Sequence, residues 1–160
     1  MNIGWKDIAF ELPSELAPDV HAAWSWLVPA PWEPVLCSKI GGIFLKEAGG
    51  KVLWLDTAVA LVESVTDSVD EFHDICRKKS DIVHEWFGTG LVEQLHAAGK
   101  VAGPGECYGF TFLPVFVEGK YAPDNMFVAP ISDVLMGNAD IHKQIAELPD
   151  GPQVRIKIVD

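Results

Sequence analysis

The first half of the chain places short apolar runs between glycine pairs, a pattern typical of antiparallel strands joined by tight turns. We predict strands at residues 35–40, 43–46, 51–56 and 58–65. Gly41-Gly42 predicts a bend, and Gly49-Gly50 predicts a two-residue hairpin turn. The unbroken apolar run at 52–55 predicts a central strand that is covered on both faces. A helix at 19–28 precedes this meander, because its apolar residues recur at helical spacing.

Helical spacing replaces strand patterns after residue 67. Ser68 followed by Glu71 fits a capping box, in which the serine side chain caps the first turn of a helix. The apolar positions of this helix are Val69, Phe72, Ile75 and Cys76. Gly88 and Gly99 predict the ends of two further helices.

The last third of the chain predicts a strand pair and a long helix. Gly103-Pro104-Gly105 is a forced turn, because proline fixes φ and glycine admits positive φ. We predict strands at 107–117 and 126–129, and a final helix at 131–148 that Gly137-Asn138 can divide in two. An edge strand is predicted from the alternation of Val154, Ile156 and Ile158 with polar neighbours.

The order of these elements predicts the fold class. Strands followed by clustered helices favour an α+β fold over alternating β-α-β units. The chain has 160 residues, which suits one domain with a substantial core. No linker, internal repeat or low-complexity segment interrupts it. We therefore predict a single domain over 1–160, with a mainly antiparallel or mixed sheet and helices packed on it.

Composition narrows the class of protein. Hydrophobic residues make up 49% of the chain, which is too apolar for disorder. No apolar run reaches the roughly 18–20 residues of a membrane span, and the first residues lack the features of a signal peptide. We therefore expect a cytoplasmic protein that does not enter a membrane. Its three cysteines, Cys37, Cys76 and Cys107, lack C-x-x-C spacing and are predicted to be reduced, buried thiols.

The charge is strongly negative and unevenly distributed. A net charge of −11 argues against nucleic-acid binding, which needs Lys and Arg to displace counterions from phosphates. Residues 56–74 contain no Lys or Arg, and three bases follow at 77–79. The acids in this run are Asp56, Glu63, Asp67, Asp70, Glu71 and Asp74. Acids at the start of a helix and bases at its end suit the helix dipole, so helix stability explains part of this pattern.

A second interpretation of the acidic run is functional. Long-range attraction between opposite charges steers a basic partner toward an acidic surface. We select Asp67, Asp70, Glu71 and Asp74 as the predicted partner-binding residues.

One group of residues carries an alternative chemistry. His73 and Cys76 lie three positions apart on one helix face, and Asp70 lies three positions before His73. That spacing suits a metal site or a Cys–His pair. A third ligand is missing and Cys76 lies on the apolar face, so we predict no catalytic residue, no metal and no cofactor. A small-ligand-binding protein or enzyme that uses these three residues is the alternative function.

Three tryptophans lie close together beside a proline-rich stretch. They are Trp24, Trp26 and Trp32. Anchoring in the core is the main interpretation, and an exposed aromatic patch for binding is the alternative.

Several motifs occur in a fixed order between residues 35 and 148. They are Ile43-Phe44-Leu45 with Val52-Leu53-Trp54-Leu55-Asp56-Thr57, Ser68-Val69-Asp70-Glu71-Phe72, Pro104-Gly105-Glu106-Cys107-Tyr108-Gly109-Phe110, Gly119-Lys120-Tyr121 with Asp124-Asn125, and His142-Lys143-Gln144-Ile145. This set resembles a bacterial domain of unknown function. That domain is similar to the C-terminal domain of Tdi-type immunity proteins, which protect type VI secreting bacteria from their own DNase toxins.

The chain also departs from that pattern. Glu118 stands where the family's "G-G-x-Y-x-x-x-N" segment has its first glycine. Only residues 1–34 precede the match, so we expect the additional N-terminal module of the full-length immunity proteins to be missing.

The resemblance implies a function but supplies no catalytic residues. It implies a non-enzymatic cytoplasmic immunity or interaction protein that neutralises a basic, nuclease-type toxin by binding it. Acidic carboxylates would then take the place of nucleic-acid phosphates on the toxin surface.

Overall fold

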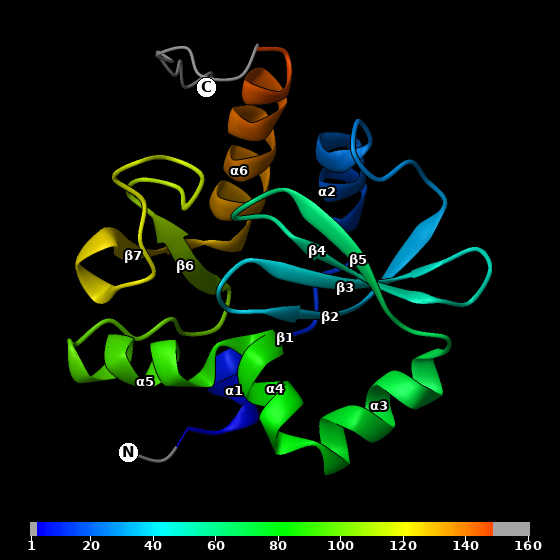
Figure 1. Cartoon of the computed structure of the whole chain (residues 1–160), viewed down its shortest axis with the longest axis horizontal. Coiled ribbons are helices and arrows are strands. Elements are labelled where there is room, and N and C mark those ends of the chain that lie inside the picture. The colour runs from blue at the N-terminus through cyan, green and yellow to red at the C-terminus, as the bar shows by residue number, and fades with distance from the viewer. Residues whose placement is uncertain (1–2, 149–160) are drawn as a thin grey trace.

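The computed structural model describes residues 3–148 (Figure 1). The predicted edge strand at Val154, Ile156 and Ile158 therefore lies outside the described residues. The helices are α1 (Trp5–Ile8), α2 (Ala17–Trp24), α3 (Val69–Lys78), α4 (Ser80–Phe87), α5 (Thr89–Ala97), the short 3-10 helix η1 (Pro123–Asn125) and α6 (Ile131–Ala146). The strands are β1 (Ala9–Phe10), β2 (Trp32–Ser38), β3 (Gly42–Glu47), β4 (Val52–Asp56), β5 (Leu61–Thr66), β6 (Glu106–Phe110) and β7 (Met126–Pro130).

Two antiparallel sheets organise the domain. Strands β1 to β5 form a five-stranded sheet in sequence order, and β6 pairs with β7 in a separate hairpin. Helices α2 and α6 lie on one side of the larger sheet, and α3, α4 and α5 lie on the other (Figure 1). The predicted α+β class, with a mainly antiparallel sheet and helices packed on it, is confirmed.

The 52–55 strand, β4, is an interior strand that is covered on both faces, as the apolar run predicted. Val52 and Leu55 are fully buried on opposite faces of β4, and Leu53 and Trp54 are half-buried. In β3, the middle strand, Ile43, Phe44 and Leu45 are all fully buried. Strand β4 is next to the end of the sheet, with only β5 beyond it. An apolar run shows that a strand is covered, but the order of strands is decided by pairing between segments far apart in sequence.

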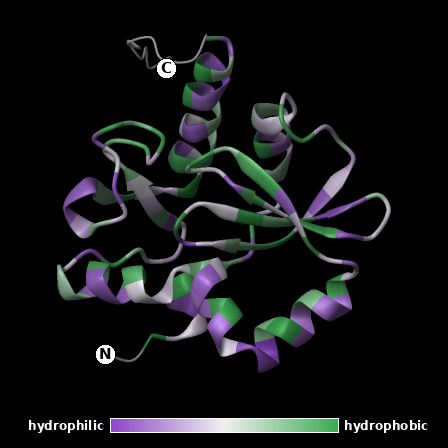
Figure 2. Cartoon of the chain, viewed as in Figure 1, coloured by the Kyte–Doolittle hydropathy of each residue, from purple (hydrophilic) through white to green (hydrophobic). Residues whose placement is uncertain are grey.

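Two apolar cores flank the sheet. Phe44 points to the core that α3, α4 and α5 share, and its ring lies 4.9 Å from the ring of Phe72 and 5.3 Å from that of Trp86. Ile43 and Leu45 point to the other core, beneath α2 and α6. Apolar residues run along the strands of the larger sheet, while hydrophilic residues are prominent on α3 (Figure 2). Successive side chains of a strand alternate between faces, so one strand serves both cores.

The three neighbouring tryptophans belong to the core. Trp24 and Trp32 are 0% and 4% exposed, and Trp26 is half-buried with its ring 5.8 Å from that of Trp24. The indole Nε1–H of Trp24 donates to the carbonyl of Leu135 at 3.0 Å, which ties α2 to α6. The alternative of an exposed aromatic patch at these residues is therefore wrong.

The predicted strand at 107–117 is too long. Strand β6 ends at Phe110, and the chain leaves the hairpin because Asn125 holds the next residues by its side chain. The N–H of Phe112 donates to Asn125 Oδ1 at 3.0 Å, and Asn125 Nδ2 donates to the carbonyls of Phe112 and Lys120 at 2.9 and 2.8 Å. These bonds give the backbone groups of Phe112 and Lys120 partners in place of strand pairing.

The final helix is continuous through Gly137-Asn138, where the sequence suggested a break. Asn138 is buried, and its Nδ2 donates to Thr57 Oγ1 at 3.1 Å. Thr57 Oγ1 in turn donates to the carbonyl of Gly41 at 2.6 Å. The polar residue that looked like a helix breaker instead fastens α6 to the loops of the sheet.

The Gly103-Pro104-Gly105 turn is positioned by a buried lysine. Gly105 has φ +78°, as predicted for this turn, while no positive φ occurs at Gly103. Lys39 is only 3% exposed, and its Nζ donates to the carbonyls of Gly103 and Glu106 at 2.8 and 2.7 Å. The N–H of Tyr108 donates to the carbonyl of Lys39 at 2.8 Å. Lys39 therefore joins the five-stranded sheet to the β6–β7 hairpin.

Candidate functional site

The start of α3 is fixed by local hydrogen bonds. Ser68 Oγ accepts the N–H of Glu71 at 3.1 Å, which confirms the predicted N-cap. Glu71 Oε2 accepts the N–H of Asp67 at 3.1 Å, one residue earlier than a capping box requires. The two bonds set the direction in which α3 leaves β5.

Packing of one aromatic ring sets the rotation of α3. Phe72 is fully buried, and its ring stacks on Trp86 with centroids 5.5 Å apart and planes 7° apart. Residues two positions away from a buried residue on a helix lie toward the opposite face. The anchored face of α3 therefore leaves the other face to solvent.

All four predicted partner-binding residues lie on the surface. They are Asp67, Asp70, Glu71 and Asp74, and each is exposed. Asp74 forms an ion pair with Arg77, in which the two side chains are 52% and 66% exposed. An exposed pair of this kind contributes about 0–1 kcal/mol, so Asp74 remains available to another cation.

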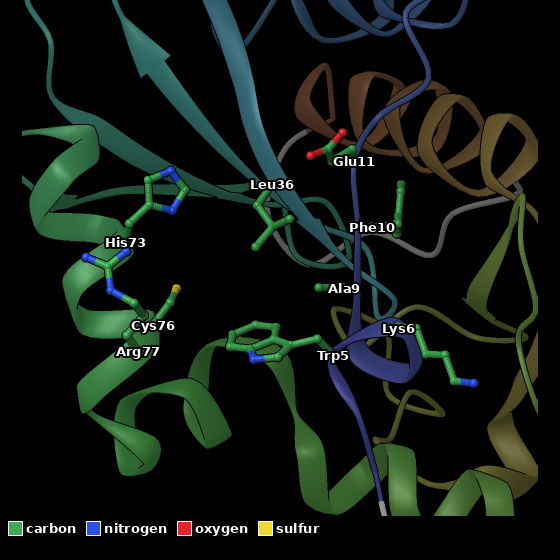
Figure 3. Close-up of a pocket in the computed structure, with 9 residues that line it drawn as sticks. All are labelled: Trp5, Lys6, Ala9, Phe10, Glu11, Leu36, His73, Cys76 and Arg77. Atoms are coloured by element: carbon green, nitrogen blue, oxygen red, sulfur yellow. The ribbon is translucent and has the colours of Figure 1, made fainter.

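A cleft lies between α3 and the segment formed by α1 and β1. Its volume is about 740 Å³. Its lining residues are Trp5, Lys6, Ala9, Phe10, Glu11, Leu36, His73, Cys76 and Arg77. The side chains of His73 and Cys76 extend from α3 toward Leu36 and Trp5, while Lys6 extends away from α3 (Figure 3).

The structure brings together two of the three residues that the alternative function needs. His73 and Cys76 both line the cleft, but Asp70 does not. Burial raises the pKa of the Cys76 thiol to about 11, although the nearby charge of Arg77 acts to lower it. Burial therefore disfavours the thiolate of Cys76, which is the nucleophilic form of a cysteine.

The described part of the chain contains no cluster of side chains that could bind a metal ion. Among residues 3–148, no group of three or more His, Cys, Asp and Glu side chains could hold a metal ion. The predictions that the protein has no metal and no cofactor stay predictions.

The other cysteines are structural. Cys37, Cys76 and Cys107 are all free, and Cys37 and Cys107 are fully buried. Burial raises the pKa of Cys37 above its ordinary value and raises that of Cys107 to about 12. The predicted reduced, buried thiols are confirmed for these two, and Cys76 is half-buried.

The sequence did not predict that three apolar residues, beside the cleft and in β5, are exposed. Trp5 is 47% exposed and borders the cleft. Leu61 and Val62 begin β5 and are 66% and 36% exposed. An apolar residue in a predicted strand is normally assigned to the core, so only the position of β5 at the end of the sheet reveals their exposure.

No protein-family model and no curated protein sequence matches the chain. The resemblance to Tdi-type immunity proteins stays a prediction. Within residues 3–148, none of the helices has the length and apolar character needed to cross a membrane.

Proposed function

We propose that this chain is a non-enzymatic cytoplasmic immunity or interaction protein that binds a basic partner, of the kind represented by a secreted nuclease toxin. The main support is the exposure of Asp70, Glu71 and Asp74 on α3 and of Asp67, which lies just before this helix. Phe72 anchors the opposite face of the same helix in the core. The three carboxylates on α3 are therefore presented by a rigid element and not by a loose loop.

An acidic helix suits a nuclease partner for a physical reason. A nuclease carries Lys and Arg where it contacts phosphates, and carboxylates offer the same charge and hydrogen-bond acceptors as phosphate oxygens. Each exposed pair contributes only about 0–1 kcal/mol. The acidic face therefore acts mainly on the association rate, and its effect weakens with salt.

The test compares wild type with the triple variant Asp67→Lys, Asp70→Lys, Asp74→Lys in a pull-down from the native cytoplasm. We expect wild type to recover a basic protein and the variant to recover far less. With the recovered partner, the variant should associate at least about tenfold more slowly at low salt and show a weaker salt dependence. All three positions are exposed, so the variant should stay folded.

A control variant distinguishes an effect of the α3 site on association from an effect of net charge alone. The triple variant Glu15→Lys, Asp19→Lys, Glu33→Lys also changes three exposed acids, which lie before α2, in α2 and in β2. If both variants slow association equally, net charge alone is responsible and the α3 site is wrong. If wild type recovers no basic protein, the proposed function is wrong.

The cleft beside α3 supports a second candidate function, binding of a small ligand. The supporting observation is that Trp5, Leu36, His73 and Cys76 converge on one open space. Native mass spectrometry of protein purified from its own host tests this function. A bound small molecule that is lost in Trp5→Ala would support it, and protein without added mass would contradict it.

A further inference from the structure

Strand β5 is an open edge of the larger sheet. It pairs with β4 alone, and within residues 3–148 no strand pairs with its other side. Its first four residues are all exposed, including two apolar ones, Leu61 and Val62. An unpaired edge presents a row of backbone N–H and C=O groups that a further strand can bind.

The opposite end of the sheet is protected, and β5 is not. Strand β2 carries Pro34, a bulge follows between Pro34 and Leu36, and β1 covers Cys37 and Ser38. Proline, lysine and bulges are the usual devices that keep edges from pairing. Strand β5 has neither proline nor lysine. Its irregularity lies opposite Val52 and Leu53, so the stretch from Leu61 to Ser64 pairs regularly with β4.

The charge around this edge selects the kind of strand that can bind. Residues 52–76 contain no Lys or Arg, and the exposed acids Glu63 and Asp67 lie in β5 and just after it. A second copy of this chain pairing through β5 would bring the two Glu63 side chains together and would join two molecules of charge −11. Like charges facing each other across strands are unfavourable. A strand that carries Lys or Arg would instead place opposite charges beside Glu63 and Asp67.

We propose that an extended, basic segment of the partner adds to β5 as a sixth strand of the sheet. The existence of a basic partner rests on the proposed function, and the strand addition specifies how it docks. Backbone hydrogen bonds to β5 supply affinity, whereas Lys or Arg beside Glu63 and Asp67 supply selectivity. Leu61 and Val62 are the side chains that the added strand covers. The acidic α3 follows β5 in the chain, after Asp67 and Ser68.

The test uses a synthetic peptide of eight residues in which valine and lysine alternate, acetylated and amidated at its ends. Two further peptides have the same sequence but carry backbone N-methyl groups on the odd or on the even residues. In an added strand, the N–H groups of alternate residues point toward β5 and the others point away. We expect one N-methylated peptide to bind at least about tenfold more weakly in fluorescence anisotropy and the other to bind like the parent.

Hydrogen exchange locates the contact. The parent peptide should slow amide exchange within Leu61–Thr66 and leave β1 and β2 unchanged. Equal binding by all three peptides, or no binding by the parent, would overturn strand addition. Some β5 amides donate to β4 and are protected in any case. Protection of the outward-facing β5 amides before any peptide is added would mean that the edge is already occupied, by a second copy or by another part of the chain, and would also overturn strand addition.

A surface variant completes the test. Val62→Lys adds an edge cation and should weaken peptide binding at least about tenfold, whereas the control Val115→Lys, at a valine that is 46% exposed elsewhere, should not. The same variants are compared in the pull-down of the native partner. If the α3 triple variant fails to recover the partner but Val62→Lys still recovers it, strand addition is wrong and the proposed function stands. Capture that the α3 triple variant leaves intact would reject the α3 site, whereas recovery of no basic protein by wild type would reject the proposed function.

Discussion

Replacing the buried Lys39 with methionine should destabilise the protein and loosen the β6–β7 hairpin. Methionine keeps most of the apolar stem and removes Nζ, which donates to the carbonyls of Gly103 and Glu106 at 2.8 and 2.7 Å. Hydrogen bonds from a charged donor contribute about 1.5–3 kcal/mol each, so about 3–6 kcal/mol is lost.

Part of this loss is offset. Lys39 is 3% exposed, and burial lowers its pKa, which shows that keeping the ammonium away from water has a cost. The effective cost of burying an ion is several kcal/mol, and Lys39→Met removes it. We therefore expect a net destabilisation of about 2 kcal/mol.

Urea denaturation measures this change, and hydrogen exchange measures its location. The midpoint should fall without a change in slope, and the amides of β6 should exchange faster than those of β3. Lys46→Met is the control, because Lys46 is an exposed lysine at the end of β3. An unchanged midpoint in Lys39→Met, together with unchanged exchange in β6, would refute this role for Lys39.

Three further predictions follow from single residues. Gly105→Val should lower stability by about 1–3 kcal/mol through strain at φ +78°, and Gly103→Val should cost less; equal thermal midpoints in the two variants would contradict this. Cys76, with its pKa raised from 9.0 to about 11, should react with iodoacetamide at pH 8 about tenfold more slowly than a free cysteine. The fraction of Cys76 present as thiolate at pH 8 is about a hundredfold smaller than for an unperturbed cysteine, but the more basic thiolate is about tenfold more nucleophilic. If mass spectrometry finds that Cys76 reacts as fast as an unperturbed cysteine, the raised pKa is wrong. Burial lowers the pKa of His142 below 6.5, against the hydrogen bond to Ala58. Its neutral form thus contributes stability above pH 6.5 that is lost as pH falls through the folded-state pKa, by at most about 1.4 kcal/mol per pH unit. In urea titrations at several pH values, the free energy of unfolding of His142→Gln should change less with pH than that of wild type. An equal change with pH in the two proteins would contradict this role of His142.

Local signals in the sequence predicted most elements well. Glycine pairs and β-branched runs located β2 to β5, because turn geometry and strand propensity act within a few residues. Ser68 marked the start of α3 for the same reason, since its side chain bonds a backbone N–H only three residues away. The exposure of the α3 carboxylates also followed from helical spacing around Phe72.

The errors share one cause, which is contact between residues far apart in sequence. Asn125 bonds Phe112, thirteen residues away, and Asn138 bonds Thr57, eighty-one residues away, so neither contact lies within a local window. The burial of Lys39 is of the same kind, because its acceptors lie more than sixty residues away. A single polar residue does not reveal which distant carbonyl it will meet.

The sequence by itself determined the class of the fold, the acidic face of α3 and the absence of a local catalytic motif, because composition, periodicity and turn chemistry are properties of neighbouring residues. Only the tertiary structure decided that β5 is an open edge, that Trp5 and Cys76 face one cleft, and that Asp70 does not join them. The order of strands and the packing angle of α3 depend on which distant side chains fill the two cores. The surfaces offered for binding are what that packing leaves uncovered.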